Sequence, residues 1–412
     1  MSTEDIRRRS QQSVAILAVR GGTGKVISIA SLVVLANLLT PQTFGAFAVV
    51  QFPVSIASLI ADAGLSAALV QRGDALTRAE EHTAWSLRLL LGILLAAIVF
   101  FVAPGVSTFY DLPPDGMSAL RVLGLNPLLD IIGLIPATRL TRALRFDRLA
   151  AAEIASLVAG QGTAIVCAWS GLGLWSLILG GLATSITGGM LVSFFVPWRP
   201  VFRIRTDAAR RLLGFGWRYQ AQGGLHVLIA RIVPMLGALW FTGTQIGHLV
   251  WAQDVARWAR IPADYAARVG FPAFSRLRED PAALRDLLGR GLRFTALTSL
   301  PAAGLGILLA PYLVEPVFGS AWVAAVPALI VYLLRTPFDA LATILLPVIY
   351  ALGEAGRGLR LSLLWAVLMW AVSLTLMMVW GSLLALPTAF LIVTALMSAL
   401  IARALPSEVR PW

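Results

Sequence analysis

Apolar runs of about 20 residues recur along this sequence, and short segments that carry most of the arginines separate them. A helix must be about this long to cross the hydrocarbon core of a bilayer. The sequence therefore predicts an all-α polytopic membrane protein of about twelve transmembrane helices. The expected spans lie near 15–39, 44–71, 84–104, 118–138, 151–171, 173–196, 214–240, 245–270, 292–314, 323–350, 361–380 and 384–402.

Composition supports a membrane protein and excludes other classes. Hydrophobic residues make up 58% of the 412 residues and charged residues only 13%, too few to solvate a water-soluble globule of this size. The net charge of +12 sits mainly in loops, and no basic stripe interleaves with exposed aromatics, so nucleic acid is not an expected partner. The single cysteine, Cys167, excludes an intramolecular disulfide and a cysteine-based metal site.

The arginines mark one side of the membrane. If the amino terminus is cytoplasmic, the cytoplasmic loops hold nearly all of them, and the positive-inside rule then predicts that both termini are cytoplasmic. Arg7, Arg8 and Arg9 read as a cytoplasmic anchor before a retained first span, because no signal-peptide cleavage site follows. The expected loop arginines are 72, 78, 88, 139, 142, 145, 148, 199, 203, 205, 210, 211, 276, 278, 285, 290, 357 and 360.

An internal repeat divides the chain into halves. At an offset of 202 residues (264 − 62), Asp62 falls on Asp264 and Thr40 on Thr242, with apolar runs between them in both copies. Each half has an even number of spans, so the copies enter the membrane in the same orientation. We therefore expect an N-terminal lobe, 1–206, with spans 1–6 and a C-terminal lobe, 207–412, with spans 7–12.

The first hairpin and two later segments resemble a known family. They are similar to the bacterial oligosaccharide flippases of the multidrug/oligosaccharidyl-lipid/polysaccharide exporter superfamily, in particular the colanic acid exporter-like polysaccharide biosynthesis proteins. The resemblance implies two pseudo-symmetric six-helix lobes around a central cavity. The matching residues are Leu35-Ala36, Phe44-Gly45, Asp62-Ala63-Gly64, Gln71-Arg72, Trp85, the run from Gly270 to Leu277 and the run from Val317 to Trp322.

This sequence departs from the family pattern in two places. An aromatic residue is expected just after Gly247, where His248 stands, and the helix that follows carries the extra charges Asp254, Arg257 and Arg260. The family often has two further spans at the carboxyl end.

Four cations fall inside expected spans, where a charge costs about 2.5–3.5 kcal/mol. Lys25 and Arg20 lie in the first span, Arg231 in the seventh and Arg335 in the tenth. Together they would form a basic cavity that binds a lipid diphosphate, because guanidinium groups pair with phosphate oxygens. Alternatively, these side chains snorkel to an interface or pair internally, as Arg335 would with Asp339 one turn later.

Four acids are candidates for gating or coupling. Asp62 and Asp264 either form a gating contact or pair at a helix end with Arg72 or Arg268, and we favour the helix-end pair. Asp130 and Asp339 are candidates for proton or sodium coupling, because a buried carboxylate can exchange a proton.

No segment offers an enzyme's residues, so no catalytic or metal site is predicted. Gly21 to Lys25 resembles a phosphate-binding loop only superficially, since Val26 stands where Ser or Thr is required. Glu80-Glu81 and Glu279-Asp280 read as solvated loop charges beside arginines.

The resemblance implies a flippase of the bacterial inner membrane without a cofactor. It would move undecaprenyl-diphosphate-linked oligosaccharide units to the periplasmic leaflet by alternating access, for exopolysaccharide or O-antigen synthesis. Its implied partners are the lipid-linked oligosaccharide, membrane lipids and other polysaccharide-assembly proteins, and coupling to a Na⁺ or H⁺ gradient is left open. Two alternatives remain: a cation-coupled drug or metabolite exporter, which would favour acids in its cavity, and a membrane polymerase or ligase of lipid-linked sugars.

Overall fold

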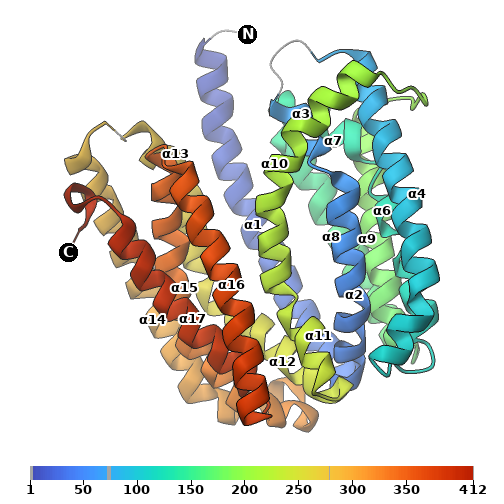
Figure 1. Ribbon diagram of the computed structural model, residues 1–412, viewed down its shortest axis with the longest axis vertical. Helices are drawn as coiled ribbons and strands as arrows, with labels where there is room; N and C mark the ends of the chain where they lie inside the picture. Colours follow the sequence, from blue (N-terminus) through green and yellow to red (C-terminus); the bar gives the residue numbers. More distant parts are fainter. Residues whose placement is uncertain (1–2, 72–75, 278, 412) are drawn as a thin grey trace. The chain divides into compact units, whose positions relative to one another are not determined.

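The computed structural model describes residues 3–71, 76–277 and 279–411, and every regular element within those ranges is a helix. The side chains of residues 3–20 and of some residues inside three later helices lie outside this description. The chain divides into two compact units, Met1–Val227 and Leu228–Trp412. The division of the functional lobes at 206 remains a prediction. Figure 1 labels the helices.

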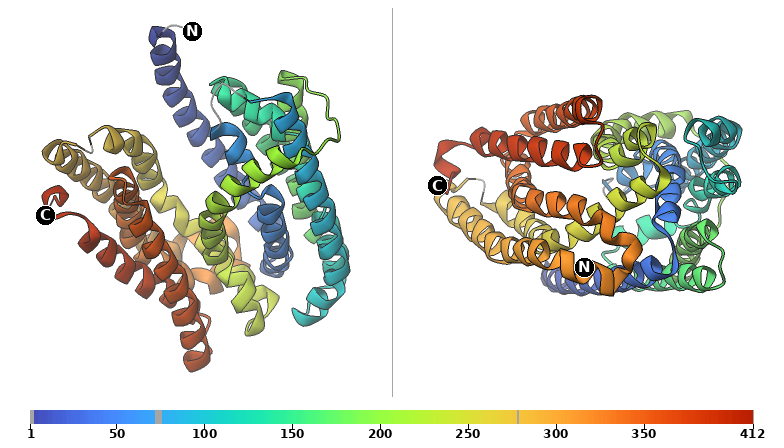
Figure 2. Two further views of the ribbon diagram at one scale, coloured as in Figure 1. Left: turned by 45° about the horizontal axis from the view of Figure 1, so that its top comes forward. Right: turned by 90° about the horizontal axis from the view of Figure 1, so that it is seen from below.

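The first unit consists of antiparallel helices joined by short connections. Within it, α8 and α9 pack together along their lengths, and α1 packs on α8 (Figures 1 and 2). Its elements are α1 (Thr3–Leu38), α2 (Pro41–Asp62), α3 (Leu65–Gln71), α4 (Arg78–Phe109), α5 (Gly116–Leu123), α6 (Asn126–Leu129), α7 (Leu134–Arg142), α8 (Phe146–Trp169), α9 (Leu174–Phe195) and nearly all of α10 (Thr206–Ala230).

The second unit is organised around α15, which packs against both α14 and α17 (Figure 2). Its first part is broken into short pieces and its last part consists of long helices. The elements are α11 (Ile232–Leu236), η1 (Gly237–Leu239), α12 (Gly243–Ala256), η2 (Arg257–Arg260), α13 (Ile261–Arg276), α14 (Pro281–Phe318), η3 (Ser320–Ala325), α15 (Val326–Ala351), α16 (Ala355–Trp380), α17 (Ala385–Ala404) and η4 (Ser407–Val409).

The two threonines that the repeat aligns both cap the start of a helix. Thr40 and Thr242 are the N-cap residues of α2 and α12, and each side chain accepts a hydrogen bond from the backbone N–H three residues later. Such a cap satisfies one of the amides that a helix start leaves unpaired. Gln245 completes a capping box with Thr242, and Pro41 opens α2. The predicted hairpin turn before α2 is confirmed.

The break between α2 and α3 requires glycine. Ala63 and Gly64 both have positive φ, at 45° and 69°. A Cβ on Gly64 would overlap the backbone of Gly216 in α10, within the same unit. The absence of a side chain at Gly64 therefore permits both the left-handed turn and the close approach of α10.

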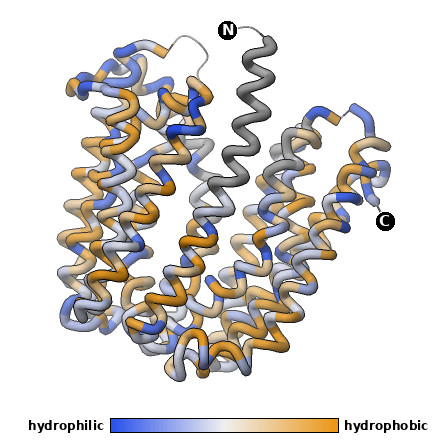
Figure 3. Tube along the Cα trace, turned by 180° about the vertical axis from the view of Figure 1, so that it is seen from behind, coloured by the Kyte–Doolittle hydropathy of each residue, from blue (hydrophilic) through white to orange (hydrophobic). Residues whose placement is uncertain are grey.

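The surface of the long helices suits lipid rather than water. The helix Arg78–Phe109 is the most apolar of all, yet only 22% of its most apolar window is buried inside the structure. Large apolar side chains such as Phe101 and Leu297 are 78% and 76% exposed. Figure 3 shows hydrophobic residues along the helices and hydrophilic residues at several connections. Because these faces would be unfavourable in water, the chain is a multi-pass membrane protein.

The described residues contain nine helices long and apolar enough to span a membrane, or ten if the pair Gly116–Leu129 and Leu134–Arg142, bent by 44°, forms one span. The predicted spans 214–240 and 245–270 correspond to α10–η1 and α12–α13, which are helical but outside this set. Charges interrupt their apolar windows, including Arg231, Asp254, Arg257 and Asp264. The count of twelve therefore stays a proposal.

Candidate functional site: two interior charge clusters

In the first unit, an ion pair joins the second and third long helices. Asp62 is the last residue of α2, and one of its carboxylate oxygens lies 2.5 Å from a terminal guanidinium nitrogen of Arg88 on α4. The hydroxyl of Ser66 donates to the same carboxylate at 2.5 Å, and Arg88 donates to Ser66 at 3.1 Å. The side chains of Arg88 and Asp62 are only 10% and 21% exposed. This burial strengthens their attraction, because little water screens it.

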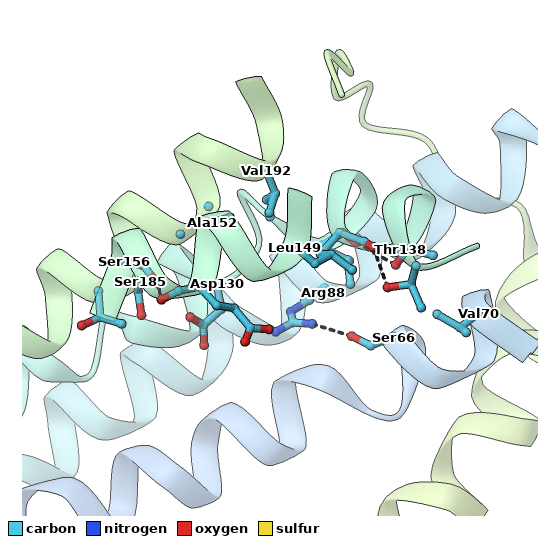
Figure 4. A pocket seen from close by; sticks show the side chains of 18 residues that line it. Ser66, Val70, Arg88, Asp130, Thr138, Leu149, Ala152, Ser156, Ser185 and Val192 are labelled. Atoms are coloured by element: carbon cyan, nitrogen blue, oxygen red, sulfur yellow. Dashed lines mark hydrogen bonds between the residues drawn. The ribbon is translucent and has the colours of Figure 1, made fainter. Parts of the chain in front are cut away.

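A pocket of about 470 Å³ opens beside this pair (Figure 4). Asp130, at the C-cap of α6, points into it beside Ser185, within electrostatic range of Arg88 and Asp62. Hydroxyl groups and small residues of α7, α8 and α9 form the rest of its wall. The lining residues are Ser66, Val70, Arg88, Asp130, Gly133, Leu134, Ala137, Thr138, Thr141, Leu149, Ala152, Glu153, Ser156, Thr184, Ser185, Gly188, Gly189 and Val192.

This pocket carries an excess of acid. Asp62 and Asp130 surround one arginine, Arg88, so the three groups have a formal charge of −1 when ionised. Glu153 of α8, an exposed residue, also lines the pocket. Such a site favours a proton, a cation or the hydroxyl groups of a sugar over an anion.

In the second unit, the interior charges balance. Asp339 on α15 accepts hydrogen bonds from Arg335 at 3.0 Å and from Arg260 at 3.1 Å. Arg260 also lies 3.4 Å from Asp264 on α13. The guanidinium carbon of Arg335 lies 5.1 Å from the ring centre of Phe390 on α17, a cation–π contact. The side chains of Arg335 and Asp339 are 14% and 15% exposed.

More charges adjoin this second cluster. Arg257 and Asp254 pair at 3.1 Å across one turn, and both are about half exposed, at 48% and 43%. Arg231, at the break between α10 and α11, lies within electrostatic range of both. Counting these three groups with the four above gives four arginines against three aspartates, a formal charge of +1.

The structure locates the side chains of only three of the four cations predicted to form a basic cavity. Lys25 is exposed on α1, and the side chain of Arg20 lies outside the described residues. Arg335 forms the ion pair with Asp339 that the sequence left open as an alternative, and Arg231 lies beside Asp254. A cavity that joins Lys25 and Arg20 to Arg231 and Arg335 would involve both units, and it stays a prediction.

The predicted acids all find partners within their own unit. Asp62 pairs with Arg88, a partner that the sequence did not suggest; Arg72 and the side chain of Arg268, the expected partners, lie outside the described residues. Asp264 and Asp339 share Arg260. Whether any of these groups gates or couples transport stays a prediction.

Two sequence interpretations were wrong. Arg88 was expected in a loop but lies inside α4, 9% exposed, because the capping box of Thr77 and Glu80 starts the helix at Arg78. A helical register counted from that cap would have placed Arg88 three turns inside.

Glu80 and Glu81 were expected to be solvated, yet they are 3% and 5% exposed. Glu81 receives two hydrogen bonds from Arg139, at 2.6 and 2.7 Å, and Glu80 caps α4. Asp280 is the N-cap residue of α14, where it accepts a hydrogen bond from the backbone N–H of Ala283, and both it and Glu279 are exposed, as the sequence predicted.

Solved structures show the fold class. The lipid II flippase MurJ in an inward closed conformation superposes with a TM-score of 0.74 at 15% identity, covering 95% of this chain and 88% of that one. An inward-facing multidrug resistance MATE family transporter of the MOP superfamily gives 0.68 at 15% identity, covering 92% of both chains. The chain therefore has the all-helical MATE/MurJ-like fold.

The sequence shows the family. The model of the family described as "Polysaccharide biosynthesis protein" matches residues 34–327, so the chain belongs to that family. A second model, described as "Lipid II flippase MurJ", matches residues 266–409. The confirmed resemblance covers the hairpin, the Gly270 segment and most of the apolar runs named from the sequence.

Curated relatives are distant and longer. The teichuronic acid biosynthesis protein TuaB of Bacillus subtilis is 25% identical over 74% of this chain and 63% of its own length. The succinoglycan biosynthesis transport protein ExoT of Rhizobium meliloti is 27% identical over 72% and 60%, respectively. The lipopolysaccharide biosynthesis protein WzxC of Escherichia coli is 23% identical over 78% and 66%. The chain thus spans less than two thirds of the length of each of these three relatives.

Proposed function

We propose that this protein is a flippase that moves undecaprenyl-diphosphate-linked oligosaccharide units across the bacterial inner membrane, for exopolysaccharide or O-antigen synthesis. The observation that carries the proposal is the family match over residues 34–327 on a MurJ-like fold. Relatives named for teichuronic acid, succinoglycan and lipopolysaccharide biosynthesis support a substrate built from sugars, and the name of ExoT supports transport.

In this proposal, two six-span lobes enclose a central cavity and rock about it, so that the cavity opens to one side of the membrane at a time. The weakly apolar segments α10–η1 and α12–α13 then count as the seventh and eighth spans. Their charges are tolerated because they face protein or water rather than lipid, as intramembrane charges do. Both termini lie in the cytoplasm in this proposal, as the positive-inside rule predicts from the loop arginines.

The diphosphate is bound by cations. Lys25 is exposed on α1 and free to approach a phosphate, and Arg20 lies within two turns of it along the helix. Arg231 and Arg335 supply guanidinium groups from the second unit. Because Arg260 also holds Asp339, Arg335 can release that carboxylate and turn to a phosphate without leaving it unpaired. The sugars occupy hydrated space, and the lipid tail stays in the bilayer.

The experiment is a leaflet assay in a deletion strain. Loss of a flippase leaves lipid-linked units on the cytoplasmic leaflet, whereas loss of a polymerase leaves single units on the periplasmic leaflet. Accumulation on the periplasmic side, or no accumulation, contradicts the proposal. An exporter of drugs would change drug resistance and leave the lipid-linked units unaffected.

The role of the cations is tested by complementation with Lys25→Ala and Arg335→Ala at normal membrane levels. Both variants are expected to reduce translocation by tenfold or more, as expected for losing about 1.4 kcal/mol or more of binding. Lys25→Arg keeps the charge and serves as the matched control. Full translocation by both alanine variants removes the basic cavity from the account.

A further inference from the structure

The two units place aspartates in corresponding segments, but the arginine near each pair of aspartates forms different ion pairs. In the span numbering of the proposed function, Asp62 and Asp264 lie in the second span of their halves, on α2 and α13, and Asp130 and Asp339 lie in the fourth, at the C-cap of α6 and on α15. Between each pair of acids stands an arginine, Arg88 in the first unit and Arg260 in the second. The arginine comes from a different helix in each unit.

The bonding differs. Arg88 contacts the acid of the second segment, Asp62, at 2.5 Å. Arg260 makes its closer contact with the acid of the fourth segment, Asp339, at 3.1 Å, and lies 3.4 Å from Asp264. The second unit thus shows an arginine bridging both acids, whereas in the first unit the arginine is bonded to one acid only.

Asp130 is consequently left without an ion pair among the residues that the structure describes. Ser185 of α9 lines the pocket beside it, the charged groups within electrostatic range of it are Arg88 of α4 and Asp62 of α2, and Glu153 of α8 lines the same pocket. An ionised carboxylate in this position faces the like charge of Asp62 and an arginine that is already paired with Asp62. Binding a proton, or taking a share of Arg88, relieves that repulsion.

We propose that Asp130 is a proton-binding site in the first unit and that Arg88 changes its ion pairs when Asp130 ionises. With Asp130 protonated, Arg88 pairs with Asp62 alone, the arrangement observed here. When Asp130 releases its proton to water in the pocket, Arg88 swings to bridge both acids, as Arg260 does in the second unit. The pocket in Figure 4 gives the carboxyl group its route to water.

The movement of Arg88 would couple proton binding at Asp130 to the positions of the helices. Arg88 belongs to α4, whereas Asp130 lies at the break between α6 and α7, where the segment bends by 44°. A bond from Arg88 to Asp130 would draw this break toward α4 and loosen the end of α2. This use of the site rests on the proposed function, in which the lobes rearrange during transport.

The test is infrared spectroscopy of the purified full-length protein in lipid nanodiscs without substrate. The carbonyl band of a protonated carboxylic acid is followed from about pH 8 to about pH 4. We expect this band to contain a component that titrates in the wild type and is missing in Asp130→Asn. In Asp62→Asn, Arg88 is free to pair with Asp130, so this component should appear about one pH unit lower.

The matched controls are Asp339→Asn, whose carboxylate two arginines hold, and Glu153→Gln at the exposed side of the pocket; both should keep the component. Identical spectra of the wild type and Asp130→Asn overturn the site, and an unmoved component in Asp62→Asn overturns the exchange of Arg88. A component that responds to Na⁺ at fixed pH but not to pH identifies a sodium site and also overturns the proposal.

Because no substrate is present, this result is independent of the proposed function. A protein that shows the component but does not move lipid-linked sugars refutes the flippase and leaves the proton site standing. A protein that moves lipid-linked sugars but lacks the component refutes the proton site and leaves the flippase standing.

Discussion

In the first unit, the aspartates Asp62 and Asp130 lie near one arginine, Arg88, whereas in the second unit two arginines and two aspartates balance around Asp339. Both units are built from helices of the same kind, and aspartates recur at corresponding segments. The difference lies in where the arginines are. A repeat can therefore keep its helices and still give each copy a different interior charge.

The largest expected effect comes from removing the acid at the centre of the balanced cluster. Asp339→Ala leaves Arg335 without its counterion and Arg260 with only the longer contact to Asp264. Arginine stays charged at any accessible pH, so the cost cannot be avoided by deprotonation. We expect a loss of about 3 kcal/mol, measured by thermal unfolding of the detergent-solubilised protein.

The matched control for that variant is Asp286→Ala. Asp286 pairs with Arg290 on the exposed face of α14, both 68% exposed, so its removal should change stability little. If Asp339→Ala unfolds at the same temperature as Asp286→Ala, the second cluster is not a stabilising core.

A smaller effect is expected in the first unit. Arg88→Ala leaves Asp62 and Asp130 without their arginine, but carboxylates can take up protons, so we expect a loss of about 2 kcal/mol at neutral pH that shrinks in acid. Unfolding measured at two pH values checks the sign. The double variant Arg88→Ala/Asp130→Asn should be more stable than Arg88→Ala alone, since one of the two like charges is gone. Equal stability of the two variants would show that Asp130 does not interact with this site.

The smallest effect compares the two threonine caps. Thr242→Ala removes a cap that is part of a capping box, whereas Thr40→Ala removes a single cap beside Pro41, which already fixes the start of α2. We expect losses of about 1 kcal/mol and about 0.5 kcal/mol, respectively. Thermal unfolding with Thr→Ser at both positions as the control distinguishes them, because serine keeps the capping oxygen. A larger loss at Thr40 than at Thr242 contradicts the comparison.

Local signals in the sequence predicted local structure well. Apolar length located the long helices, and the repeat aligned two threonines that the structure shows to be the N-cap residues of α2 and α12. The span count was less secure, because Arg231, Asp254, Arg257 and Asp264 interrupt the apolar windows of α10–α13. Hydropathy cannot distinguish a charge that a neighbouring helix neutralises from one that ends a span.

Contacts between helices were the part that sequence could not supply. The acids were found one at a time, as charges in apolar runs, but Asp62 and Arg88 are 26 residues apart and Arg260 and Asp339 are 79 apart. Their pairing depends on which faces of the helices meet. Arg335 and Asp339, one helical turn apart, formed an ion pair that their spacing had already suggested.

Reconstitution tests the central claim most directly. The purified protein is placed in liposomes with a fluorescent diphosphate-linked oligosaccharide lipid, and an enzyme added outside reports which fraction of the lipid reaches the outer leaflet. The account predicts that the accessible fraction rises above the half already present outside, or is replenished after that half is consumed, and that Lys25→Ala slows this replenishment. If the inner half stays protected for as long as in protein-free liposomes, the protein does not move lipid-linked sugars.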